Sequence, residues 1–183
     1  MESKKDIRKR ILEQRAYMSP KDWEEKSRII TQKVVSHPFF LRAAAIYCYV
    51  DYRQEVCTRS IIEHAWKAGK KVAVPKIVDD YMEFYYISDF SELIKGYRGI
   101  LEPAVTTIPA QDKKTLIIMP GVAFNKSRAR IGYGKGYYDT YLQSHTDCIT
   151  MAICFALQMV EQIPTELHDY KPDIIITEET IYA

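Results

Sequence analysis

Short apolar runs recur along the chain and are separated by segments long enough to form helices. The run at residues 115–120 (TLIIMP) contains four consecutive large apolar residues, which is typical of a strand covered on both faces of a sheet. The same strand character is found in residues 43–50, 71–75, 83–87, 148–155 and 173–177. Strands that alternate with helices indicate a parallel, layered α/β sheet, because neighbouring parallel strands must be joined by a long crossover connection.

Helix signals occupy the intervals between these runs. Helices are expected at residues 4–17, 19–37, 58–67 and 136–144. In the first of them, Ile7 and Ile11 lie on one face and charged side chains lie elsewhere. The second begins with Ser19 as an N-cap and Pro20 at the first helical position. The chain has no repeat or linker, so we predict a single domain over residues 1–183, an α/β/α sandwich with a mainly parallel, Rossmann-like central sheet.

The charge balance and the cysteines exclude several classes of protein. Lys and Arg number 26 and Asp and Glu number 24, a net charge of +2 that argues against broad nucleic-acid binding. The N-terminal segment MESKKDIRKRILEQR lacks the apolar core of a secretory signal, and no apolar run is long enough to span a bilayer. The cysteines show no C-x-x-C spacing, which favours free thiols of a reducing compartment. We therefore expect a cytoplasmic protein without nucleic-acid or membrane partners, and we expect a monomer because a single core accounts for the apolar content.

The most informative segment is residues 130–139 (RIGYGKGYYD), which follows the central apolar run and leads into a helix. Open α/β sheets bind their ligands at such strand-to-helix junctions. Three of the chain's seven glycines, Gly132, Gly134 and Gly136, fall within it. The absence of side chains at these positions lets backbone N–H groups approach an anion closely. We call residues 130–139 the glycine segment.

Charged residues accompany these glycines. Arg130 and Lys135 carry charges suited to phosphate oxygens, and Asp139 lies one turn into the following helix, where it could hold Mg²⁺ against those phosphates. The segment is neither the dinucleotide-binding G-x-G-x-x-G pattern nor a Walker A loop. On these residues alone, a phosphate site and a flexible glycine turn with surface charges are about equally supported.

The pattern P-G-V-A-F at residues 120–124, followed by R-x-G-x-G-x-G-Y-Y-D at residues 130–139, resembles the signature of the 5-formyltetrahydrofolate cyclo-ligase family. The resemblance covers nearly the whole chain. Lys4 and Arg8 match the family's N-terminal K-x-x-x-R motif, and residues 168–177 match its H-D-x-x-x-D ending.

Two positions in the loop ahead of the glycine segment depart from the family's pattern. Asn125 stands where the family usually has Asp, and Arg128 stands where it usually has Gly. Because every position of R-x-G-x-G-x-G-Y-Y-D is retained, these departures bear on the turn geometry of the loop more than on the chemistry.

The resemblance implies an ATP- and Mg²⁺-dependent enzyme that converts 5-formyltetrahydrofolate to 5,10-methenyltetrahydrofolate with release of ADP and phosphate. The formyl oxygen would first be phosphorylated and then displaced by N10 of the folate, so the protein needs no covalent nucleophile. Carried over residue by residue, the ATP-binding positions are Lys4, Arg8, Arg130, Ile131, Gly132, Tyr133, Gly134, Lys135, Gly136, Tyr137 and Tyr138. The folate-binding positions are Val50, Glu55, Tyr133 and Tyr137. Catalysis falls to Arg130, Lys135 and Tyr137, and Mg²⁺ binding to Asp139 and Asp169.

Each assignment has a plainer alternative in its local sequence. Lys4 and Arg8 could form a solvated helix face, and Glu55 could act on the dipole of the helix that follows it. Asp169 could cap a turn, and the nearby Asp173 could begin a strand or replace Asp169 as the metal ligand. The alternative functions are a small-molecule kinase or ligase on the same scaffold and a non-catalytic nucleotide- or RNA-binding module. The near-neutral charge counts against the module.

Overall fold

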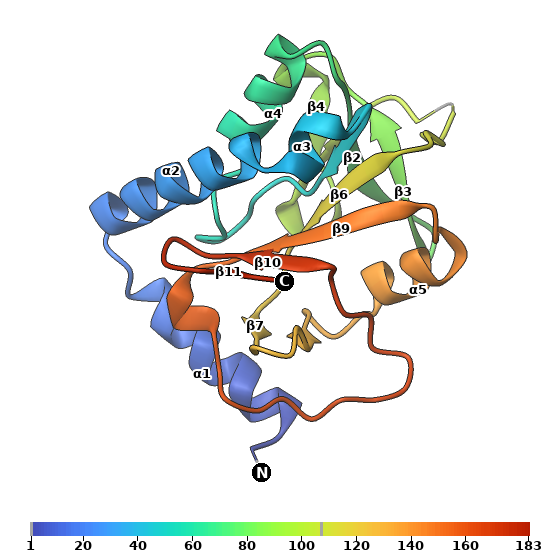
Figure 1. Cartoon of the computed structure of the whole chain (residues 1–183). Coiled ribbons are helices and arrows are strands. Elements are labelled where there is room, and N and C mark those ends of the chain that lie inside the picture. Colours follow the sequence, from blue (N-terminus) through green and yellow to red (C-terminus); the bar gives the residue numbers. More distant parts are fainter. Residues whose placement is uncertain (1, 107) are drawn as a thin grey trace.

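The computed structural model describes residues 2–106 and 108–183, and within them a seven-stranded central sheet runs in the order β11–β10–β9–β6–β1–β2–β3 (Figure 1). Its strands are β1 (Ala45–Cys48), β2 (Lys71–Val78), β3 (Tyr81–Tyr86), β6 (Thr115–Met119), β9 (Cys148–Ile153), β10 (Ile174–Ile176) and β11 (Ile181–Tyr182). The five inner strands pair in parallel, whereas β3 and β11 run antiparallel to their neighbours. The predicted mainly parallel α/β sheet is confirmed. The reversal into β3 depends on a tight turn in which Asp79 has a φ of 54°, a detail that an apolar run does not reveal.

Helices cover both faces of the sheet, so the predicted α/β/α layering is confirmed (Figure 1). One face carries α2 (Pro20–Ser36), α3 (Pro38–Arg42) and α4 (Arg59–Lys67), and the other carries α5 (Tyr137–Ser144). Successive strand residues point to opposite faces. Ile118 therefore packs in the core beneath α2 and α4, while Ile117 packs in the core beneath α5.

The first helix, α1 (Lys4–Ala16), packs on a small hairpin instead of the central sheet. The hairpin consists of β7 (Ala123–Phe124) and β8 (Arg130–Ile131). Ile7 and Ile11 of α1 join a separate apolar cluster with Ile131 of β8. Because β8 is the start of the glycine segment, this packing brings the charged N-terminal residues of the chain to that segment.

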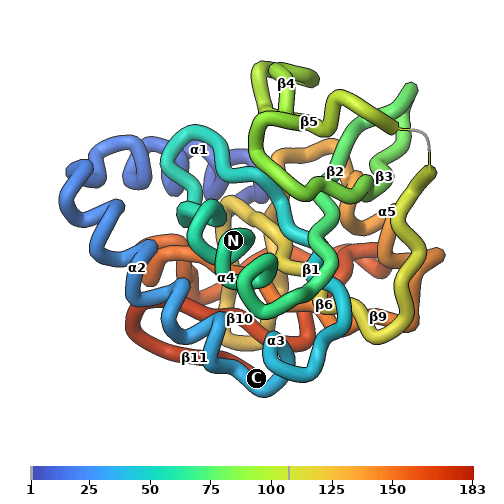
Figure 2. Tube along the Cα trace, turned by 90° about the horizontal axis from the view of Figure 1, so that it is seen from above, coloured from blue at the N-terminus to red at the C-terminus, as the bar shows by residue number. Residues whose placement is uncertain are grey.

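Several short elements lie outside the sequence prediction. β4 (Leu93–Lys95) and β5 (Leu101–Pro103) form a second hairpin, which projects beside β2 and β3 in Figure 2. Three short 3-10 helices are η1 (Phe90–Glu92), η2 (Tyr97–Gly99) and η3 (Ala156–Gln158). Residues 97–110 are punctuated by Pro and Gly, which indicates a connection, and the described part of this range contains η2 and β5. Strands of two or three residues are too short to show an alternating pattern.

The thiols agree with the sequence prediction in the residues that the structure describes. Cys48 and Cys154 are buried, Cys57 and Cys148 are half-buried, and none of the four is in a disulfide. None of the described helices has the length and apolar character needed to cross a membrane.

Candidate active site

A cavity of about 990 Å³ opens at the carboxyl ends of the inner strands. Tyr49 follows β1 and Pro120 follows β6, and both line it. Other walls come from α1, the β4–β5 hairpin and the glycine segment. This is the edge at which open α/β sheets bind their ligands, as the sequence predicts.

Every residue assigned to ATP, folate or metal from the family resemblance lines this one cavity. They are Lys4, Arg8, Val50, Glu55, Arg130, Ile131, Gly132, Tyr133, Gly134, Lys135, Gly136, Tyr137, Tyr138, Asp139 and Asp169. Asp173, the alternative metal ligand, does not line it. Instead its Oδ2 accepts hydrogen bonds from the backbone N and the Oγ1 of Thr150, each 2.8 Å long, so Asp173 has the strand-end role that its local sequence suggests.

The glycine segment has a backbone that other residues adopt only with strain. Gly134 and Gly136 have φ angles of +95° and +69°. Gly136 is also the N-cap residue of α5 and provides no side-chain cap, so N–H groups in the first turn of α5 stay free for a ligand. From α1, the Nε of Arg8 donates to the carbonyl oxygen of Gly132 at 2.9 Å, which ties the helix to the segment.

Arg130 and Asp139 form a largely buried ion pair at one end of the segment. The Nη2 of Arg130 lies 2.8 Å from Oδ1 of Asp139, and the backbone N of Tyr170 donates to the same oxygen at 3.0 Å. Among the described residues, Oδ2 of Asp139 accepts no hydrogen bond and Nε of Arg130 has no partner. One carboxylate oxygen thus keeps its full hydrogen-bonding capacity, and one buried guanidinium nitrogen is without a partner.

Lys4 joins the same end of the cavity to the C-terminal part of the chain. Its Nζ lies 2.7 Å from Oδ2 of Asp169 and 3.1 Å from Oε1 of Glu166. Burial disfavours the charged form of Lys4, but the hydrogen bonds to Asp169 and Glu166 outweigh it and raise the pKa of Lys4. Burial also disfavours the charged form of Asp169, but the bonds from Lys4 and from the backbone of Glu166 outweigh it and lower the pKa of Asp169.

Asp139 and Asp169 could bind Mg²⁺ if a ligand supplied further oxygen atoms to the coordination shell. The described residues contain no group of three or more His, Cys, Asp or Glu side chains placed to bind a metal ion. Mg²⁺ commonly uses one or two carboxylates and completes its shell with phosphate oxygens and water. The free Oδ2 of Asp139 fits that pattern.

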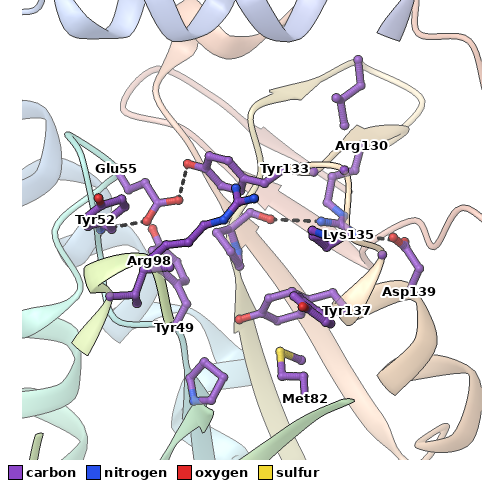
Figure 3. Close-up of a pocket in the computed structure, with 18 of the residues that line it drawn as sticks. Tyr49, Tyr52, Glu55, Met82, Arg98, Arg130, Tyr133, Lys135, Tyr137 and Asp139 are labelled. Atoms are coloured by element: carbon purple, nitrogen blue, oxygen red, sulfur yellow. Dashed lines mark hydrogen bonds and ion pairs between the residues drawn. The ribbon is translucent and has the colours of Figure 1, made fainter. Parts of the chain in front are cut away.

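The other end of the cavity is organised around Glu55. Glu55 is only 6% exposed; its Oε1 accepts from the hydroxyl of Tyr133 at 2.5 Å and its Oε2 from the backbone N of Tyr52 at 2.9 Å (Figure 3). Burial raises the pKa of Glu55 to about 7, although the Tyr133 hydrogen bond and the positive charge of Arg15 act to lower it. Tyr137 and Met82 lie on another side of the same cavity, so an aromatic and apolar wall accompanies the carboxylate.

Sequence reasoning missed residues on α1 and on the β4–β5 hairpin. Arg15 is 2% exposed, and its Nη2 donates to the hydroxyl of Tyr133 at 2.9 Å. A signal was present, because Arg15 continues the buried face of Ile7 and Ile11 at a spacing of four residues. Arg98 reaches across the mouth of the cavity from the hairpin (Figure 3), and no sequence signal marks it.

The two departures from the family's pattern lie in the turn between β7 and β8. The Oδ1 of Asn125 accepts from the backbone N of Ala129 at 2.8 Å and from Ser127 at 2.9 Å. Arg128 has a φ of +64°, a conformation that glycine adopts without strain. Its Nη1 donates to the carbonyl oxygen of Asp173 at 2.5 Å. The hairpin therefore forms with the residues that this chain has.

Comparisons with known proteins agree with this geometry. A solved structure of a 5,10-methenyltetrahydrofolate synthetase from Aquifex aeolicus superposes with a TM-score of 0.86 at 26% identity, covering 97% of this chain and 91% of that one. A probable 5-formyltetrahydrofolate cyclo-ligase of Schizosaccharomyces pombe is 32% identical over 176 residues, 86% of each chain. The mouse 5-formyltetrahydrofolate cyclo-ligase is 29% identical over 97% of this chain and 95% of its own length.

A family model confirms the resemblance seen in the sequence. The description of that model is the 5-formyltetrahydrofolate cyclo-ligase family, and it matches residues 1–178. The match takes in α1, the glycine segment and the last inner strand, and it includes every residue that lines the cavity. The chain therefore belongs to the 5-formyltetrahydrofolate cyclo-ligase family.

Proposed function

We propose that this cyclo-ligase converts 5-formyltetrahydrofolate to 5,10-methenyltetrahydrofolate, with hydrolysis of ATP to ADP and phosphate. The observation that carries the proposal is a single cavity with two chemically different ends. One end combines cationic side chains with the glycine segment, and the other combines a buried carboxylate with aromatic and apolar walls. An anionic nucleotide and a flat, polar-edged pteridine are the two ligands that such ends suit.

At the phosphate end, Lys4, Arg8, Arg130 and Lys135 would bind the triphosphate together with backbone N–H groups of the glycine segment. The free Oδ2 of Asp139 supports Asp139 as a ligand of Mg²⁺, and Asp169 would be the second carboxylate, released from Lys4 when the phosphates arrive. Bound Mg²⁺ would supply charge neutralisation to the transferring phosphoryl group. The protein's own contribution is to place that group in line with its acceptor.

At the folate end, Glu55 would accept hydrogen bonds from the N–H groups at the edge of the pteridine. Val50 and Tyr137 would contact its ring, and Tyr133 would lie between the two ligands. The formyl oxygen would take the γ-phosphoryl group of ATP, which turns a poor leaving group into a good one. Attack of N10 on the formyl carbon then closes the ring, N10 loses its proton, and phosphate departs with the formyl oxygen.

No step in this scheme needs a nucleophile from the protein, and phosphoryl transfer of this kind depends mainly on positioning and charge. Arg130, Lys135 and Tyr137 are the residues that we assign to the reacting groups. We further propose that the protein acts as a cytoplasmic monomer on these small molecules.

The test is the absorbance of the purified protein with 5-formyltetrahydrofolate, Mg²⁺ and ATP. The expected result is the long-wavelength band of the methenyl product, appearing only when ATP is present and lost when Mg²⁺ is chelated. ADP release with a stable phosphorylated product and no methenyl band would contradict the proposal and indicate a small-molecule kinase instead.

A further inference from the structure

Arg15 is a buried charge that none of the assigned roles uses. It lies at the end of α1, is 2% exposed and lines the cavity. Its Nη2 donates to the hydroxyl of Tyr133 at 2.9 Å and to the carbonyl oxygen of Arg53 at 3.2 Å. Its Nη1 has no hydrogen-bond partner among the described residues.

Hydrogen bonds alone do not explain why Arg15 is buried. Burying a guanidinium is costly, and a buried arginine that serves only the fold usually has its donors satisfied. Here Nη1 has no partner, whereas Nη2 donates to the hydroxyl of Tyr133, and that hydroxyl in turn donates to Glu55. The contacts run from Arg15 to Tyr133 to Glu55, and they join α1, the glycine segment and the loop after β1.

Among the groups around Glu55, Arg15 is the one whose charge favours the ionised form of the carboxyl. Of the ionisable groups that act on the Glu55 carboxyl, Arg15 is the cation and Asp51 the anion, while Tyr133 donates its hydroxyl. Two further phenols, Tyr49 at the end of β1 and Tyr138 in α5, are neutral near pH 7 as phenols ordinarily are, and burial raises the pKa of each further. Arg15 is therefore the positive charge that favours the ionised form of a carboxylate otherwise disfavoured by burial.

We propose that Arg15 is a positioning residue of the folate site, which acts through Tyr133 to favour the ionised form of Glu55 and to direct its carboxylate into the cavity. The inference rests on the proposed function in one respect, that Glu55 binds the pteridine. An ionised Glu55 can accept two hydrogen bonds from the ligand, whereas a protonated Glu55 has lost part of that capacity. Because Tyr133 belongs to the glycine segment, the same contact also holds that segment against the folate end.

The experiment compares Arg15→Met and Arg15→Lys with Arg10→Met, a control on the exposed face of α1. The titration of Glu55 is followed in the ligand-free protein by NMR of its labelled carboxyl carbon. We expect Arg15→Met to raise the pKa of Glu55 by about one unit, from the usual effect of a nearby cation, and so to lower its ionised fraction about fivefold at pH 7. Arg15→Lys restores the charge and should titrate close to the wild type, and Arg10→Met should not differ from it.

Steady-state kinetics supply the second measurement. Arg15→Met should raise the KM for 5-formyltetrahydrofolate about fivefold at pH 7, recover at higher pH, and change kcat much less. An unchanged titration of Glu55 in Arg15→Met, or a KM in Arg15→Lys as high as in Arg15→Met, overturns the inference.

Two provisions keep the result interpretable. If Arg15→Met does not fold, Tyr133→Phe breaks the same chain of contacts without removing the buried charge, and an unchanged Glu55 titration in Tyr133→Phe also overturns the inference. If the wild-type protein forms no methenyl product, the proposed function fails, while the ligand-free titration still decides whether Arg15 sets the charge of Glu55.

Discussion

The two ends of the cavity are built in different ways. The phosphate end has cations whose partners are carboxylates and carbonyls at the cavity wall, such as Lys4 on Asp169 and Arg8 on Gly132. The folate end has a carboxylate removed from water, with both oxygens already bonded. Charges of the first kind can change partners when a ligand arrives. The second kind has an ionisation state that the surrounding fold determines.

This difference predicts that substitutions at the two ends change different properties of the enzyme. At the phosphate end, removing a charge should reduce the rate of phosphoryl transfer and leave the pH dependence alone. At the folate end, removing a charge should change folate affinity together with the pH dependence. Substitutions at both ends test that separation, beginning with the largest effect.

Lys135→Ala should have the largest effect on activity. Lys135 is exposed on the glycine segment and lines the cavity, so its loss removes charge from the transition state without disturbing the core. We expect kcat to fall roughly 100- to 1,000-fold, as for other electrostatic donors, with unfolding by urea unchanged. Lys126→Ala, an exposed lysine outside the cavity, should retain full activity. Equal losses in both variants would remove Lys135 from the site.

Glu55→Gln should act on folate affinity and on pH dependence together. Loss of hydrogen bonds to a charged acceptor should raise the KM for 5-formyltetrahydrofolate roughly 10- to 100-fold above neutral pH. The wild type should lose folate affinity as pH falls through about 7, and Glu55→Gln should not. The measurement is the KM for folate from pH 6 to pH 9. A variant that keeps the wild-type pH profile would place the titrating group elsewhere.

The same substitution has a stability consequence of definite sign. Burial raises the pKa of Glu55 from 4.5 to about 7, so the folded protein binds this proton more tightly than the unfolded chain. Its contribution to the free energy of unfolding is therefore greatest at low pH and falls as pH rises from about 4.5 to about 7. Relative to Glu55→Gln, the wild type should lose stability over that interval, which urea unfolding at pH 5 and pH 8 can measure.

The residues of the proposed phosphate end could be grouped from the sequence because most of them are close together in it. Arg130, the glycines, Lys135 and Asp139 lie in one segment, so spacing alone brings them together. The folate end could not be assembled in this way. Glu55 and Tyr133 are 78 positions apart, and the bond between them depends on how the glycine segment packs on α1. The resemblance to a family supplied Glu55, but neither the resemblance nor the spacing supplied Arg15.

The fold likewise has elements that local sequence predicts and elements that depend on tertiary packing. β6 and β10 are continuous apolar runs and were predicted, because burial on both faces leaves a clear pattern. β7 and β8 have two residues each, and their pairing depends on the Asn125 turn and on contact with α1. Such elements are stabilised by tertiary contacts and leave little trace in local sequence.

Asp169→Asn and Asp173→Asn form a matched pair for the metal assignment. Only Asp169 lines the cavity, so only Asp169→Asn should increase the Mg²⁺ concentration needed for half-maximal activity, by about tenfold for one lost charged contact. Asp173→Asn should instead lower stability by about 1 kcal/mol, because it weakens the bonds to Thr150. The measurements are a Mg²⁺ titration of the rate and urea unfolding. A greater Mg²⁺ requirement in Asp173→Asn would reverse the assignment.

The smallest expected effect separates backbone strain from ligand binding. Gly136 and Gly69 have nearly the same φ, +69° and +70°, and a Cβ atom added at either position would meet nothing within 4 Å. Alanine at each should therefore cost the same left-handed strain, about 1 kcal/mol in the free energy of unfolding. Gly136 begins α5 in the glycine segment, whereas Gly69 follows α4 and does not line the cavity.

Only Gly136→Ala should therefore raise the KM for ATP, by about threefold, because strain at the start of α5 shifts N–H groups that face the phosphates. Urea unfolding of both variants establishes that the backbone cost is equal, and the KM for ATP then reports the ligand contribution alone. Equal stability losses with unchanged KM values in both variants would mean that the start of α5 takes no part in binding the nucleotide. The phosphate end would then depend on its side-chain charges, and the loss in Lys135→Ala should account for most of its contribution.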